Sequence, residues 1–293
     1  MKVSTRLYDI ILILSFVALW ISVQIDESLE YTIGYFLVLS IGVGHGANDL
    51  KIYFKNQNLK LKTSIKFICI YAGAVILGFL AFFIIPDLIL ALFLIVSGFH
   101  FGQEHFERYK FPSSIIKTLF ITCYGLSIIV ALLHLNIDYS LPIVHDLIDS
   151  TLTAPYIRWT LYTLSAITII LGIIQLWRTA IDSILKEILY LIVIYIIFAS
   201  SSLIWGFAIY FILWHSVPSI HHQIQHLHGS VTNKTILNYI QSSILFWLVA
   251  LLFLGLLYYF LNEKTAFFLS VIVAFLGGIT FPHVFVMHRI HKP

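Results

Sequence analysis

The chain has 293 residues, of which 60% are hydrophobic and only 11% are charged. A soluble domain of this length cannot bury so much apolar surface, so the composition indicates an integral membrane protein and excludes a soluble enzyme. The formal net charge of +3 is too small to suggest a nucleic-acid partner.

Apolar runs recur along the whole chain, and about 20 such residues are needed to cross the hydrocarbon core of a bilayer. We therefore expect one transmembrane catalytic domain over residues 1–293, all-α, built as a polytopic helical bundle of about eight to ten helices. A long apolar run around residue 200 is divided at Ser200–Ser202, because three hydroxyl side chains interrupt it there. The expected spans are 8–25, 31–50, 64–85, 87–106, 115–135, 156–177, 187–200, 202–226, 239–261 and 266–288.

The distribution of cationic residues predicts the orientation of these spans. With ten spans and a cytoplasmic N-terminus, all but two of the 17 Lys and Arg residues fall on one side; the exceptions are Arg158 and Lys264. Cationic loops are retained in the cytoplasm. The sequence thus predicts a multi-pass protein of the cell membrane with both termini in the cytoplasm.

Histidines gather at one depth in this topology. The second, fourth, eighth and tenth spans run in the same direction, and each carries histidine near its cytoplasmic end. These residues are His45, His100, His105, His215, His221, His222, His226, His283 and His288. A single histidine near a helix end is compatible with an ordinary interfacial residue. Four helices with histidine at matched depth instead predict a metal site near the cytoplasmic face.

The types of side chain at this depth restrict the metal. Neutral imidazole suits zinc, copper, iron and nickel, and the lack of thiolates argues against an iron–sulfur cluster or a cysteine-type zinc site. Asp49 and Glu104 each follow a histidine by four residues, which places them on the same helix face. We expect them to accept hydrogen bonds from imidazole N–H groups, although an ordinary interfacial carboxylate is the alternative for each.

Four short motifs in order carry a resemblance to a known family: GHGANDL (44–50), FHFGQEH (99–105), WHS (214–216) and PHV (282–284). This series resembles the Brp/Blh family of membrane β-carotene 15,15′-dioxygenases. The resemblance implies an iron enzyme, with Fe(2+) as cofactor, that splits β-carotene at its central double bond with O2. The products would be two molecules of all-trans-retinal, which would serve a microbial rhodopsin.

The resemblance also implies iron ligands, which fall on His45, His100 and His215. The family pattern pairs two histidines four residues apart in the helix of the WHS motif, but position 219, four residues after His215, is serine here. We expect His222 to be the fourth ligand, because Pro218 should kink or break the helix before it. His221, His226 and His105 remain alternatives.

Other residues near the motifs are candidates for supporting roles. Around the metal, or in contact with the substrate, we expect Asp49, Glu104, His105, His221, Phe99, Trp214 and His283. β-Carotene dissolves in the lipid bilayer, so a site among membrane helices meets it without transfer through water. Aromatic side chains beside the histidines would supply the flat apolar walls that such ligands need.

Two other classes of protein fit parts of the pattern. Membrane di-iron hydroxylases and desaturases use clusters such as HxxxH and HxxHH, and the stretch HSVPSIHHQIQH is similar to these. A non-enzymatic metal-handling membrane protein or a transporter is the second alternative. Transporters usually place polar residues near the middle of the membrane, whereas here they gather at one face.

Overall fold

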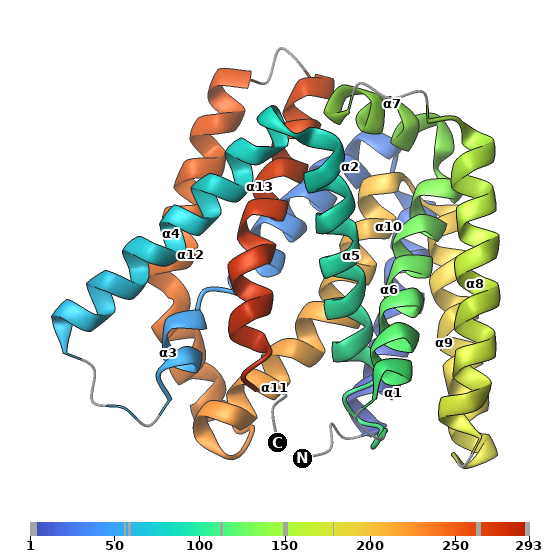
Figure 1. Ribbon diagram of the computed structural model, residues 1–293, viewed down its shortest axis with the longest axis horizontal. Coiled ribbons are helices and arrows are strands. Elements are labelled where there is room, and N and C mark those ends of the chain that lie inside the picture. Colours follow the sequence, from blue (N-terminus) through green and yellow to red (C-terminus); the bar gives the residue numbers. More distant parts are fainter. Residues whose placement is uncertain are drawn as a thin grey trace. The chain divides into compact units, whose positions relative to one another are not determined.

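The computed structural model describes residues 5–55, 57, 60–111, 114–148, 152–177, 179–261 and 265–290. Within these ranges every regular element is a helix, and none is a strand (Figure 1). The predicted all-α fold is therefore confirmed.

The helices follow one another along the chain with short connections. Their bounds are α1 Thr5–Gln24, α2 Glu27–Leu37, the π-helix η1 Val38–Gly42, α3 Asp49–Tyr53, α4 Leu61–Ile84, α5 Pro86–His105, α6 Ile115–Leu135, α7 Ile137–Leu147, α8 Ala154–Leu176, α9 Ile181–Ser200, α10 Leu203–Ile209, the π-helix η2 Tyr210–Ser216, α11 Val217–His228, α12 Asn233–Leu261 and α13 Thr265–Met287.

Eight helical segments within the described residues are long and apolar enough to cross a membrane. They are Arg6–Gln24, Leu61–Ile84, Pro86–His105, Ile115–Leu135, Ala154–Leu176, Leu203–His228, Asn233–Phe253 and Ser270–Met287. Each coincides with one of the ten spans expected from the sequence. Eight such helices fit a multi-pass membrane protein.

The other two expected spans differ from the helices in an informative way. The span 31–50 is interrupted, because η1 ends at Gly42 and residues 45–48 form turns before α3 begins. Gly42, Gly44 and Gly46 explain the interruption, since glycine weakens a helix interior by about 1 kcal/mol relative to alanine. The span 187–200 lies within α9, which is not among the eight long apolar segments.

Serine hydroxyls explain the division near residue 200. α9 ends at Ser200, and the Ser202 hydroxyl accepts a hydrogen bond from the backbone N–H of Trp205 at 3.4 Å, which caps the start of α10. The buried Glu30 carboxylate accepts the Ser202 backbone N–H at 2.8 Å. The division predicted at this point is confirmed.

The chain forms two compact units. The first comprises residues 1–38, 97–142 and 151–218, and the second comprises residues 39–96, 143–150 and 219–293. The sequence-based expectation of one catalytic domain over 1–293 stays a prediction.

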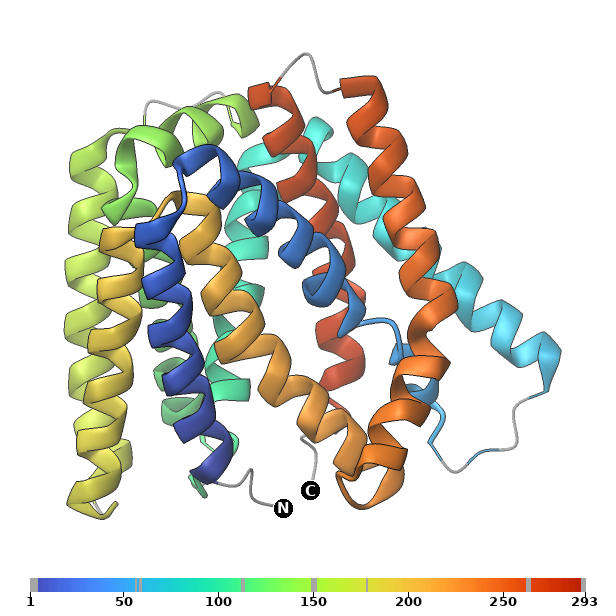
Figure 2. The same cartoon turned by 180° about the vertical axis from the view of Figure 1, so that it is seen from behind.

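In the first unit, α6 packs along α8, and α1 lies beside α9 (Figure 2). Glycines bring the end of α5 against α6. A Cβ atom at Gly102 would lie 1.9 Å from the Ile121 carbonyl oxygen, and one at Gly125 would lie 1.9 Å from that of Gly98. Only glycine permits this approach, as is common where membrane helices pack closely.

In the second unit, α4 and α13 pack along each other and α3 contacts both. The two long helices meet at glycines: a Cβ at Gly78 would lie 3.0 Å from the Cα of Gly278. α3, α4 and α13 each contribute a polar side chain to the histidine cluster of this unit, so this contact helps to position the cluster.

Candidate metal centre

The turn after η1 presents His45, which is 6% exposed. Its Nδ1 donates a hydrogen bond to the carbonyl oxygen of Gly42. An imidazole that carries its proton on Nδ1 has the lone pair on Nε2, which is the nitrogen that can bind a metal. The local backbone therefore selects the tautomer of His45.

A polar network fixes the backbone at this point. The carbonyl oxygen of His45 accepts a hydrogen bond from Gln223 Nε2 at 2.9 Å and one from the Tyr239 hydroxyl at 3.3 Å. Tyr239 also donates to Gln223 Oε1 at 2.6 Å, and Asn48 Nδ2 donates to the Tyr239 carbonyl oxygen at 3.1 Å. Helices α11 and α12 thus hold the turn that carries His45.

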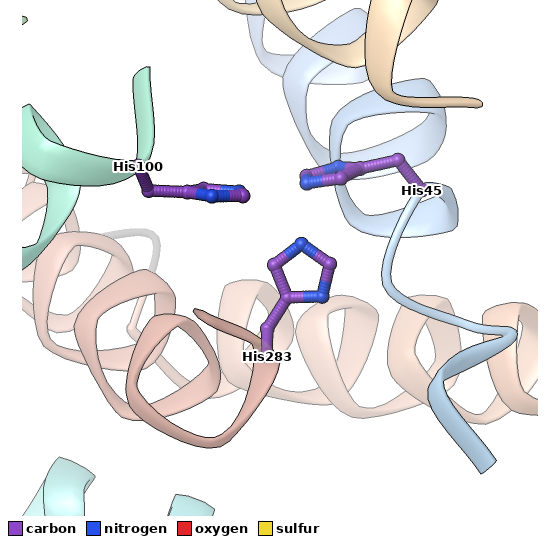
Figure 3. Close-up of side chains that lie close together, drawn as sticks. All are labelled: His45, His100 and His283. Atoms are coloured by element: carbon purple, nitrogen blue, oxygen red, sulfur yellow. The ribbon is translucent and has the colours of Figure 1, made fainter. Parts of the chain in front are cut away.

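His45 is paired with His283 of α13 in the same unit. Their ring centroids are 4.7 Å apart and the rings are perpendicular. Figure 3 shows these two rings turned toward one another; it also draws His100, which belongs to the first unit. His283 is 3% exposed, so both imidazoles of this pair are buried.

Asp49, the first residue of α3, orients His283. Both of its carboxylate oxygens lie 3.0 Å from His283 Nδ1, and the Tyr71 hydroxyl donates to Oδ2 at 2.7 Å. Asp49 is 3% exposed. A carboxylate on Nδ1–H directs the lone pair of the ring to Nε2, as with His45.

Gly46 lies against the ring of His283. A Cβ atom at position 46 would lie 3.4 Å from His283 Nδ1, which is an ordinary van der Waals distance. In the motif HGAND, therefore, the histidine, the asparagine and the aspartate each have a separate structural role.

The first unit contains a second pair of buried histidines. His100 of α5 and His215 of η2 are 2% and 1% exposed, and their ring centroids are 4.7 Å apart with an interplanar angle of 76°. Phe101 and Phe211 pack on His215 at centroid distances of 4.5 Å and 5.6 Å. Apolar rings on these faces keep water away from the pair.

The sequence suggested that the helix carrying His215 kinks or breaks at Pro218, but the helix continues through this residue. Residues 210–216 form a π-helical turn, in which the Ser216 hydroxyl donates to the Phe211 carbonyl oxygen at 2.8 Å, and α11 continues from Val217. Pro218 is then the second residue of α11, in the first turn, where a missing N–H is tolerated. Inserted π turns of this kind often occur at functional sites.

His105 belongs to a different cluster of the first unit. Its Nε2 lies 2.8 Å from Glu187 Oε2 and 3.1 Å from the Tyr124 hydroxyl. Arg108 forms an ion pair with Glu187, and Tyr109 donates to its Oε1 at 2.6 Å. Burial and the Glu187 carboxylate raise the pKa of Tyr109 well above its usual range, so this hydroxyl stays protonated.

The remaining predicted residues lie as follows. Glu104 is fully buried in α5, and Phe99, in the same helix, is half-buried. Trp214 is 1% exposed and donates through Nε1 to the Ser15 hydroxyl at 3.0 Å. His221 and His222 are adjacent in α11, with ring centroids 6.2 Å apart.

Several polar residues of these clusters were not found from the sequence. Tyr71 and Tyr239 lie in helices without any motif, and Gln223 lies among the histidines of residues 215–226, where no local pattern singles it out. Glu187 did carry a signal, because a carboxylate early in an apolar run needs a partner when it is buried.

The fold and these clusters define a class: an all-helical, multi-pass membrane protein with pairs of buried histidines. Residues 36–291 match the family model of beta-carotene 15,15'-dioxygenase. The chain belongs to this family, and the resemblance found in the motifs is confirmed. Searches of curated proteins and of solved structures found no match.

Proposed function

We propose that this protein is an iron-dependent dioxygenase that splits β-carotene at its central 15,15′ double bond. One molecule of β-carotene and one of O2 give two molecules of all-trans-retinal, which balances all atoms. The family match over residues 36–291 carries this proposal.

The side chains present suit an iron ion. Each unit contains two buried imidazoles in contact, His100 with His215 in the first and His45 with His283 in the second. His45 and His283 each donate a hydrogen bond from Nδ1 to a protein oxygen. Nitrogen ligands of this kind bind iron, and the other ring nitrogen commonly donates to a carboxylate or carbonyl group. We propose His45, His100 and His215 as ligands.

The bound iron would supply a centre at which O2 is activated for attack on the polyene. The residues of the chain have simpler roles. Gly42 and Gln223 fix the orientation of His45, and Phe101 and Phe211 exclude water around His215. Exclusion of water protects the reactive centre from side reactions.

The substrate would enter from the bilayer. Apolar side chains on the long helices are exposed in large numbers, as in α4 and α12, which indicates surfaces that contact lipid. A carotenoid dissolved in the hydrocarbon region reaches such a surface without crossing water. The retinal formed would supply a microbial rhodopsin.

The proposal is tested by expressing the chain in a host that accumulates β-carotene and extracting the pigments. We expect loss of the orange colour and appearance of retinal. Unbleached pigment in cells that contain well-expressed protein would contradict the proposal.

A further inference from the structure

The described residues of the second unit include three buried imidazoles, those of His45, His222 and His283, and two of them, His45 and His283, are in contact and have the same hydrogen-bonding pattern. His45 Nδ1–H donates a hydrogen bond to the Gly42 carbonyl oxygen, and His283 Nδ1–H donates one to the Asp49 carboxylate. Both rings are therefore fixed with Nε2 as the nitrogen that carries the lone pair. Two rings in contact with matched tautomers are what a shared metal ion requires.

Asp49 strengthens this interpretation through its charge. A buried carboxylate is costly unless a cation or several donors compensate it. In the described part of the chain, Asp49 makes no ion pair with lysine or arginine; it contacts the neutral donor Tyr71 and the ring of His283. A cation bound at His283 Nε2 would complete the compensation.

Glu187 of the first unit shows the opposite arrangement. It also bonds a buried histidine, His105, but the guanidinium of Arg108 already compensates its charge. Each pair consists of a carboxylate and an imidazole with a tyrosine hydroxyl beside them. The difference is that Arg108 forms an ion pair with the carboxylate of Glu187.

We propose that His283 is an iron ligand through Nε2, together with His45, and that Asp49 and Tyr71 are the residues that position it. This inference rests on the proposed function in taking iron as the metal. It assigns to His283 the fourth place among the ligands, where the sequence pattern had predicted His222.

The packing of the unit supports His283 in this role. His283 lies on α13, Asp49 begins α3 and Tyr71 lies on α4, and these three helices contact one another. Ser219, at the position where the family pattern has histidine, accepts a hydrogen bond from Gln223 at 3.2 Å, and Gln223 in turn holds the His45 carbonyl. Side chains preorganised by several elements bind metal with little loss of entropy.

The test measures metal affinity in the purified, iron-free protein. Fe(II) under anaerobic conditions and Co(II), whose absorption reports the coordination number and geometry of the bound ion, serve as probes. Asp49→Asn should weaken binding about 10- to 100-fold, which is typical of losing an outer partner of a ligand. His283→Gln should weaken it further and change the Co(II) spectrum.

Matched controls separate this role from general stability. Glu187→Gln makes the same chemical change at the other buried carboxylate–histidine pair and should leave metal affinity unchanged. Tyr71→Phe should weaken binding a few-fold, whereas Tyr124→Phe, which removes a hydroxyl from His105, should not. If His283→Gln yields no folded protein, the Asp49→Asn and Tyr71→Phe comparisons decide, because both keep the shape of the side chain.

Unchanged metal affinity and Co(II) spectrum in His283→Gln would overturn the inference, as would equal effects of Asp49→Asn and Glu187→Gln. Retinal formation is measured separately. A wild-type protein that binds metal through His283 and leaves β-carotene intact would contradict the proposed function and support this inference. Retinal formation by a protein whose metal affinity does not depend on His283 would support the proposed function and contradict this inference.

Discussion

Two buried carboxylate–histidine pairs, one in each unit, can be compared directly. Glu187 with His105 and Asp49 with His283 have similar hydrogen-bond lengths, 2.8 Å and 3.0 Å, and both include a tyrosine hydroxyl. Among the residues that the structure describes, Arg108 forms an ion pair with Glu187, and no lysine or arginine forms one with Asp49. A buried carboxylate with a cation beside it has its charge compensated already. A buried carboxylate without one favours a cation bound to the histidine that it contacts.

The surroundings of the two pairs agree with this difference. The Arg108 guanidinium also lies over the Tyr8 ring, 3.6 Å from its centroid, so aromatic packing encloses the ion pair. His283 instead meets another imidazole, that of His45. These differences support the proposed metal-binding role of the Asp49 pair, and we expect the Glu187 pair to have a structural role.

The largest effect is expected from removing a proposed ligand. His45→Ala or His100→Ala should reduce retinal formation below detection while the protein remains in the membrane. Pigment extraction together with membrane fractionation measures both results. Full bleaching by either variant would show that the histidine does not hold the metal.

A smaller effect, on stability alone, is expected at the structural pair. Glu187→Gln leaves Arg108 with no full charge opposite it, and breaking a buried ion pair costs about 3–5 kcal/mol. Thermal denaturation of the purified protein should show a lower Tm with unchanged metal content. Loss of metal at unchanged Tm would reverse the assignment of the two pairs.

Glycine substitutions test the close packing that brings α5 against α6. Gly102→Ala places a Cβ on the Ile121 carbonyl oxygen and should destabilise the first unit by about 3 kcal/mol. Gly73→Ala is the matched control, because no atom lies within 4 Å of a Cβ at that position. Equal Tm values for the two variants would contradict the proposed packing.

The smallest effect is expected from Tyr109→Phe. The variant loses the hydroxyl that donates to Glu187 Oε1, and a hydrogen bond at a half-buried position contributes about 1 kcal/mol. The metal content and the retinal yield should equal those of the wild type. A decrease in either would connect the Glu187 pair to the reaction and weaken the contrast between the two pairs.

The sequence predicted what depends on local pattern. Long apolar runs indicated the helices, three serines marked the division at residue 200, and the motif around His45 marked that histidine as a candidate metal ligand. The expected span 31–50 was continued through this turn, because the apolar composition there hid the effect of three glycines.

The partners of the histidines could not be predicted in the same way. Asp49 and His283 are 234 residues apart, and Tyr71 lies in a third helix, so their meeting depends on how helices pack. The order of motifs in a sequence does not encode such contacts. His283 was therefore placed among supporting residues, and Tyr71 was not identified.

One measurement tests the central claim most directly: the yield of retinal from β-carotene in detergent micelles, with purified protein titrated with Fe(II). We predict two molecules of retinal for each β-carotene consumed, with activity that rises until one iron is bound per chain. Intact β-carotene after one iron is bound, or equal cleavage by iron-free protein, would contradict the account.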